Sequence, residues 1–216
     1  LGSYESENPS DVLIKFSGGP SGKFEPFLGI SSKITHQYKD VQFKNPGIGT
    51  VDKDLRISLQ KIVDEAVDEV IKKFGLSKIQ STREREIKMN KKIKELLEKP
   101  GLETIIKVRD ALLKKLNSME SGKLKLYLMK DWMDATERFP PYIVVTGRQG
   151  PAGFSAHVDD PLKNDRVSGL VKHKVDLVKE GNTTIKIVAG GKVIFKIRAK
   201  WKDLPFASSF KFVAGY

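Results

Sequence analysis

The residues best suited to chemistry lie near the start of the sequence. An aspartate follows a proline in Pro9-Ser10-Asp11, and a lysine ends the run Ser31-Ser32-Lys33. Two short apolar stretches, 11–16 and 26–34, flank a glycine-rich turn at 17–22, which predicts a β-hairpin. Such a hairpin would bring Asp11 and Lys33 to the same edge of a sheet. There, the carboxylate could bind Mg²⁺ and the lysine could orient or deprotonate a nucleophile, which is the chemistry of phosphodiester hydrolysis.

On these residues the sequence resembles the PD-(D/E)xK nuclease superfamily of restriction-type endonucleases. Pro9-Ser10-Asp11 matches the first half of the motif, and Ser31-Ser32-Lys33 matches the second half, with Ser31 at the position of the usual second acid. The resemblance implies a restriction-endonuclease-like sheet core, Mg²⁺ as cofactor, and Asp11, Ser31 and Lys33 as catalytic residues. It also implies an acidic metal ligand on a helix upstream of Asp11; either Glu5 or Glu7 takes its place, or that helix lies in a portion not present in this sequence.

Two alternatives remain open for this site. Gln42-Phe43-Lys44 is an alternative placement for the lysine half of the motif. It ranks second because one hairpin is enough to bring Lys33 next to Asp11, whereas Lys44 would need a further element to reach it. With the motif at Lys33, Lys44 is expected to contribute to DNA binding. Taken singly, Asp11 is also typical of an exposed strand start, and Lys33 of a charge that protects an edge strand from aggregation.

The composition favours a polyanionic partner and excludes several classes of protein. The 216 residues include 39 Lys and Arg against 27 Asp and Glu, a net charge of +12, which points to nucleic acid first and an anionic membrane second. The absence of cysteine excludes disulfide scaffolds, cysteine zinc sites and thiol nucleophiles. No apolar run is long enough to cross a membrane. The first residues resemble no signal peptide, and we expect the chain to be a piece of something longer.

Three further segments are candidates for DNA contact. In 193–201, strict alternation predicts Lys196, Arg198 and Lys200 on one strand face, where a basic stripe could follow phosphates. The predicted loop 147–153 could present Arg148 and Gln149 to base edges. The glycines of 43–50 precede a helix and could contact a phosphate, although an ordinary loop is the simpler interpretation.

Two other patterns carry weaker signals. His157, Asp159 and Asp160 could hold a divalent metal, but no third partner is identifiable and a loop before Pro161 is the simpler interpretation. The segment 17–23 fails as a P-loop because Phe24 lacks the hydroxyl that Mg²⁺ requires, so no nucleotide cofactor is expected.

The periodicity predicts a mixed α and β (α/β) fold in three consecutive zones of one compact domain: 1–50 with the nuclease hairpin, 51–138 helical, and 139–216 rich in β-strands. The helical zone is expected to contain helices over 55–74, 81–99, 102–116 and 123–135, ended where Gly75 and Pro100-Gly101 stand. The last zone is expected to contain a strand at 142–146, a short helix at 165–171 and an antiparallel meander over 174–201.

The sequence therefore predicts a Mg²⁺-dependent endonuclease of double-stranded DNA, of type II restriction-enzyme character. Cleavage of paired half-sites would require a homodimer, and the expected location is the cytoplasm of a bacterial or phage-infected cell. The first rival is a non-catalytic DNA-binding protein with a decayed nuclease fold, consistent with Ser31. The second is a basic structural or nucleoprotein assembly protein, in which Asp11 and Lys33 coincide by chance.

Overall fold

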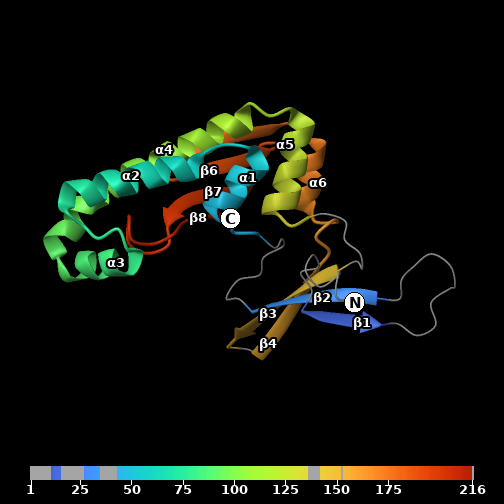
Figure 1. The fold of residues 1–216 in the computed structure, drawn as a ribbon. Helices are drawn as coiled ribbons and strands as arrows, with labels where there is room; N and C mark the ends of the chain where they lie inside the picture. Colours follow the sequence, from blue (N-terminus) through green and yellow to red (C-terminus); the bar gives the residue numbers. More distant parts are fainter. Residues whose placement is uncertain (1–10, 16–26, 35–42, 136–141, 152, 216) are drawn as a thin grey trace. The chain divides into compact units, whose positions relative to one another are not determined.

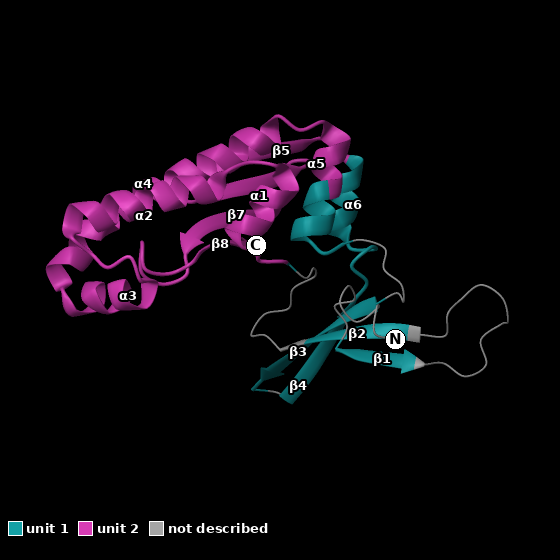
Figure 2. Ribbon diagram, viewed as in Figure 1, with its two compact units in different colours: residues 1–43, 127–172 teal, residues 44–126, 173–216 magenta. Residues whose placement is uncertain are grey.

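The computed structural model describes residues 11–15, 27–34, 43–135, 142–151 and 153–215, without the side chains of Lys15, Phe27, Lys33 and Ile34. The chain forms a mixed α and β structure, as the sequence predicts (Figure 1). Its contacts divide it into two compact units, each built from two segments (Figure 2). Unit 1 comprises 1–43 and 127–172, and unit 2 comprises 44–126 and 173–216. This division does not follow the three consecutive zones of the sequence, because each unit combines segments distant in the chain.

Unit 1 contains a four-stranded mixed sheet in the order β1-β2-β3-β4. The strands are β1 (Val12–Lys15), β2 (Phe27–Ile34), β3 (Tyr142–Gly150) and β4 (Gly153–Asp159). β1 and β2 pair antiparallel, which confirms the predicted hairpin, and its turn lies outside the described residues. β2 and β3 pair parallel, and β3 and β4 antiparallel. The hairpin that carries Asp11 is thus joined directly to a strand more than a hundred residues later in the chain.

The predicted loop at 147–153 is wrong. β3 continues through Gly147 to Gly150, and β4 begins at Gly153. Arg148 pairs with Ser155 across the two strands, so backbone pairing outweighs the turn preference of the glycines here. The predicted short helix is confirmed as α6 (Asp165–Lys172).

Unit 2 contains an antiparallel sheet in the order β5-β6-β7-β8. Its strands are β5 (Val175–Glu180), β6 (Thr184–Ala189), β7 (Lys192–Trp201) and β8 (Phe210–Gly215). The first three confirm the predicted meander, with positive φ at Gly181, Gly190 and Gly191 in its turns. β8 is a fourth strand, which the sequence interpretation did not include.

Helices of unit 2 pack on one face of this sheet, with α4 against β5, β6 and β7. The helices are α1 (Ile48–Leu55), α2 (Leu59–Phe74), α3 (Gln80–Met89) and α4 (Lys91–Asn117), followed in the chain by α5 (Ser121–Tyr127). The π-helical η1 (Leu128–Trp132) comes next in the chain and belongs to unit 1. The buried side of the sheet carries Ile185, Ile187, Phe195, Ile197, Ala199 and Phe212, each at most 1% exposed. Their burial accounts for much of the stability of unit 2.

The start and end of α2 have local causes. The Asp52 carboxylate accepts hydrogen bonds from the backbone N–H groups of Leu59 and Gln60, at 2.7 and 2.8 Å. At the other end Gly75 takes a left-handed conformation, with φ of 63°, and its N–H donates to the Ile71 carbonyl. The predicted C-terminal stop at Gly75 is therefore confirmed, whereas the helical stripe that precedes it is divided between α1 and α2.

The predicted helix end at Pro100-Gly101 is wrong, whereas the predicted helix start at Ser81 lies one residue from the start of α3 at Gln80. α4 passes through Pro100 and Gly101, and the break falls earlier at Asn90, whose side chain accepts a hydrogen bond from the Ile93 N–H at 3.1 Å. Gly101 is buried, and the Trp201 indole N–H donates to its carbonyl at 3.3 Å. Contacts with the β7–β8 connection thus hold the helix through a sequence that would end an isolated one.

Within the described ranges, none of the helices is both long enough and apolar enough to span a lipid bilayer.

Candidate active site

The β1–β2 hairpin brings Asp11 beside the Ser31-Ser32-Lys33 run. The Asp11 N–H donates to the Ile30 carbonyl at 2.8 Å, and the Ser32 N–H donates to Oδ2 of Asp11 at 2.6 Å. The pairing of Val12 with Ile30 puts Asp11 opposite Ser31 at the next position. In the part of the chain that the structure describes, Oδ1 of Asp11 accepts no hydrogen bond, so this oxygen is available to a ligand.

Asp11 and Ser31 lie in different environments. Asp11 is exposed, whereas Ser31 is fully buried in the centre of the sheet, where it pairs with Val144 of β3. Asp11 therefore offers a carboxylate at the surface, whereas Ser31 offers a buried hydroxyl oxygen. Lys33 pairs with Thr146 through its backbone, and its side chain lies outside the described part of the structure.

Further polar residues share this face of the sheet, and sequence reasoning did not assign them to the site. Val144 pairs with Ser31, and Thr146, two residues further along β3, presents its side chain on the same face as Val144. His157 of β4 pairs with Thr146 and therefore lies on this face as well. Asp159 of β4 pairs with Val144, which pairs with Ser31, so these three residues form the neighbouring row on the same face. Thr146 is buried and His157 is exposed. The His-x-Asp alternation in 157–159 was the usable signal, but only the pairing of β3 with β2 connects it to Asp11.

The side-chain oxygens of Asp11 and Ser31 are of the chemical type that binds Mg²⁺. Mg²⁺ prefers oxygen ligands, and it is usually held by one or two carboxylates while keeping several waters and substrate phosphates. Asp11 supplies one carboxylate next to Ser31, and the predicted ligands Glu5 and Glu7 lie outside the described residues. Asp159 is three strand spacings from Asp11, about 14 Å, too far to share one ion. Accordingly, no cluster of three His, Asp or Glu capable of holding a metal occurs among the described residues.

Arg148 and Gln149 lie near the end of β3 rather than in a loop, and both are exposed. As neighbours in a strand they point to opposite faces of the sheet. Arg148 shares the face of Ser31 and Thr146, so of the two predicted base-reading residues it is the one on the side of the candidate site.

Lys44 belongs to unit 2 and lies at the outer edge of β8. Next to it, the Asn45 side chain accepts a hydrogen bond from the Ala214 N–H at 3.0 Å, and the Pro46 carbonyl accepts one from the Phe212 N–H. Lys44 is half-buried and already has an interaction partner. Gln42, the first residue of the alternative motif, lies outside the described residues.

The predicted alternation in β7 is confirmed. Phe195, Ile197, Ala199 and Trp201 are buried, with at most 5% exposure. Lys196, Arg198 and Lys200 therefore share the opposite face of the sheet, which we call the open face of unit 2. Lys196 forms an ion pair with Glu180 at 3.0 Å.

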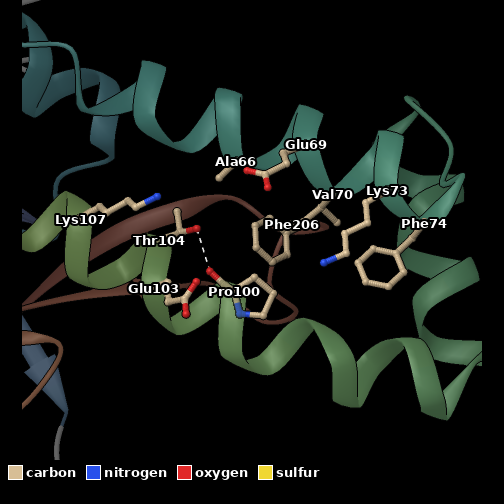
Figure 3. A pocket seen from close by; sticks show the side chains of 10 residues that line it. All are labelled: Ala66, Glu69, Val70, Lys73, Phe74, Pro100, Glu103, Thr104, Lys107 and Phe206. Atoms are coloured by element: carbon tan, nitrogen blue, oxygen red, sulfur yellow. Dashed lines mark hydrogen bonds between the residues drawn. The ribbon is translucent and has the colours of Figure 1, made fainter.

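A pocket of about 140 Å³ lies between α2 and α4, within unit 2 (Figure 3). Val70, Phe74 and Phe206 give it apolar walls, and Lys73 lies over the Phe74 ring with its Nζ 5.6 Å from the centroid. None of the predicted catalytic or DNA-binding residues lines this pocket. Its small size and mixed lining indicate no particular ligand.

The comparisons with known proteins give no relative for this chain: no family model, curated protein or solved structure matches it.

Proposed function

We propose that this chain is a Mg²⁺-dependent endonuclease that hydrolyses phosphodiester bonds of double-stranded DNA, in the manner of a type II restriction enzyme. In this proposal unit 1 carries a restriction-endonuclease-like sheet with Asp11, Ser31 and Lys33 at its catalytic centre. The observation that carries the proposal is the hydrogen bond from the Ser32 N–H to Asp11, which holds a carboxylate beside the Ser31–Lys33 strand. A homodimer acting on paired half-sites, in a bacterial or phage-infected cytoplasm, completes the proposal.

Asp11 and Lys33 have distinct roles in this proposal. Mg²⁺, when bound, polarises the scissile phosphate and lowers the pKa of a water molecule. Asp11 would hold the ion through Oδ1 while Oδ2 stays fixed by Ser32. Lys33 would orient the attacking water or accept its proton as the new phosphorus–oxygen bond forms and the bond to the leaving oxygen breaks. The net charge of +12 favours the polyanionic substrate.

A second function is favoured by Ser31 itself. The position of the usual second acid holds a neutral side chain that is fully buried, which weakens the expected affinity for Mg²⁺. This observation supports a non-catalytic DNA-binding or nucleoprotein assembly protein that retains the fold. Both functions require DNA binding, and only the first requires cleavage that depends on Asp11.

The experiment that separates them is cleavage of mixed plasmid and phage DNA by the full chain, with Mg²⁺ or with EDTA. Asp11→Asn should abolish cleavage but keep DNA binding, because asparagine retains an oxygen that can accept the Ser32 N–H but loses the charge that binds the metal. Asp54→Asn is the matched control, since Asp54 is exposed on α1 and should change neither property.

Cleavage by the Asp11→Asn variant at the wild-type rate would overturn the assignment of the site. DNA binding without Mg²⁺-dependent cleavage by the wild-type chain would favour the second function. Absence of binding would reject both.

A further inference from the structure

Two lysine pairs lie directly opposite each other on the open face of unit 2. Lys186 of β6 pairs with Lys196 of β7, and Lys200 of β7 pairs with Lys211 of β8. Like charges that are directly opposite across strands destabilise a sheet unless an anion lies between them. The two pairs differ in whether the chain itself provides that anion.

The first pair is neutralised from within the chain. Glu180, on β5, makes ion pairs with Lys186 at 3.4 Å and with Lys196 at 3.0 Å. The hydrogen bond from Lys196 is the main reason that the pKa of Glu180 lies below its ordinary value, with the bond from Lys186 adding to the effect. This carboxylate therefore stays ionised and bridges the two lysines.

The second pair has no such acid. Among the described residues, neither Lys200 nor Lys211 forms an ion pair, and the same is true of Arg198, which precedes Lys200 on this face. The acids that the register places on the open face, Asp176 and Glu180, both lie on β5 at the far edge of the sheet. Both already pair with lysines, Asp176 with Lys174 at 3.3 Å.

The three cations are held where they are by the sheet. The other face of β7 and β8 is buried, so Arg198, Lys200 and Lys211 cannot turn away from the open face. They lie within about 7 Å along one strand and about 5 Å across to the next. Lys200 and Lys211 are half-buried, which weakens the screening of their mutual repulsion by water.

We propose that Arg198, Lys200 and Lys211, here called the basic triad, bind backbone phosphates of double-stranded DNA. A phosphate takes the position between Lys200 and Lys211 that Glu180 takes between Lys186 and Lys196. Glu180 in turn limits the surface by keeping two further lysines from the DNA. The choice of DNA as the polyanion rests on the proposed function, and the phosphate chemistry rests on the geometry of unit 2.

The test is the salt dependence of binding, measured by fluorescence anisotropy of a labelled duplex with the full chain in EDTA. For the wild type, log K should fall as log salt rises. The double variant Lys200→Gln/Lys211→Gln should make this dependence less steep by roughly 0.9 per lost phosphate contact, about 1.8 in all. If the two proteins bind equally at 1 M salt, the variant should bind the duplex about 60-fold more weakly than the wild type at 0.1 M salt.

The matched control carries the same change of charge on the helical layer. Lys92 and Lys94 are exposed on α4 without a described ion pair, and Lys92→Gln/Lys94→Gln should leave the slope unchanged. An unchanged slope in the Lys200/Lys211 variant, or an equal loss in the control, would overturn the proposal.

Glu180→Gln provides a test in the opposite direction. Removal of its charge releases Lys186 and Lys196, so this variant should bind the duplex more tightly and with a steeper salt dependence. Weaker or unchanged binding would contradict the role given to Glu180. Thermal unfolding supplies a readout of folding: duplex should raise the midpoint of the wild-type chain, and raise it less in the folded Lys200/Lys211 variant.

Two further arms separate this inference from its rivals. Inorganic phosphate at matched ionic strength should compete no better than chloride, and strong competition would instead assign the triad to free phosphate. If the wild-type chain does not cleave DNA but the Lys200/Lys211 variant shows the expected change in salt dependence, the proposed nuclease activity is rejected and the DNA-binding surface is supported. If the wild-type chain cleaves DNA but the Lys200/Lys211 variant binds it normally, the DNA-binding surface is rejected and the nuclease activity is supported.

Discussion

At Gly101, α4 packs closely against Pro205 of the β7–β8 connection. A methyl group at Gly101 would lie 2.7 Å from Cβ and 2.9 Å from Cγ of Pro205. Both atoms belong to a ring that cannot rotate away, so the helix or the β7–β8 connection would have to move. Gly101→Ala is therefore expected to destabilise unit 2, although alanine is the better helix former.

The magnitude follows from two opposing contributions. Forcing an added methyl into a packed core costs about 2–3 kcal/mol when the neighbours are rigid. The higher helix propensity of alanine stabilises the helix by about 1 kcal/mol relative to glycine. The net loss is about 1–2 kcal/mol in the free energy of unfolding, and lengthening of the hydrogen bond from Trp201 to the Gly101 carbonyl would act in the same direction.

Urea unfolding followed by circular dichroism at the helical signal would measure this loss. Gly49→Ala is the matched control, since Gly49 lies in α1 with no atom near the position of an added methyl. That variant should be as stable as the wild type or more stable, by up to about 1 kcal/mol. If Gly101→Ala were also stabilising, the close packing of α4 against Pro205 would be refuted.

Two other predictions concern catalysis and pH. Lys33→Ala should slow the single-turnover rate by orders of magnitude while Lys44→Ala acts mainly on binding; the reverse pattern would move the motif to Lys44. Burial raises the pKa of Asp110, but hydrogen bonds from Lys179 and Arg109 outweigh it, so the folded pKa lies below its ordinary value. The stabilisation is therefore present at neutral pH and lost as the pH falls through the folded pKa. Asp110→Asn should lower the free energy of unfolding at pH 7 by less than about 1 kcal/mol, because the side chain is 40% exposed, and this difference should disappear in acid. Equal losses at neutral and acidic pH would contradict this electrostatic origin.

Elements specified by neighbouring residues could be predicted from the sequence. The α2 end at Gly75, the β5–β7 meander and the β1–β2 hairpin are all confirmed. Hydrophobic periodicity acts over a few positions, as does the conformational freedom of glycine at Gly75 and in the turns of the meander. The proximity of Asp11 to the Ser31 strand follows from the same local hairpin.

β8 was missed although its signal is also local. Phe210, Phe212 and Ala214 are buried and alternate with more exposed residues, the period of a half-buried strand. No glycine turn joins β8 to β7 in the way that Gly181 and Gly190-Gly191 join the first three strands, so it lies outside the predicted meander. The strand matters because it supplies Lys211, which completes the basic triad.

The remaining features depend on contacts between distant residues, which only the tertiary structure decides. α4 continues through Pro100 and Gly101 because Trp201, Pro205 and Phe206 pack against that turn. The parallel pairing of β2 with β3 joins His157 and Asp159 to the face of Ser31, and no local pattern encodes which strands pair. Likewise, the sequence predicts which face of β7 is basic, but only the cross-strand register reveals that Glu180 neutralises one lysine pair and leaves the other without an internal anion.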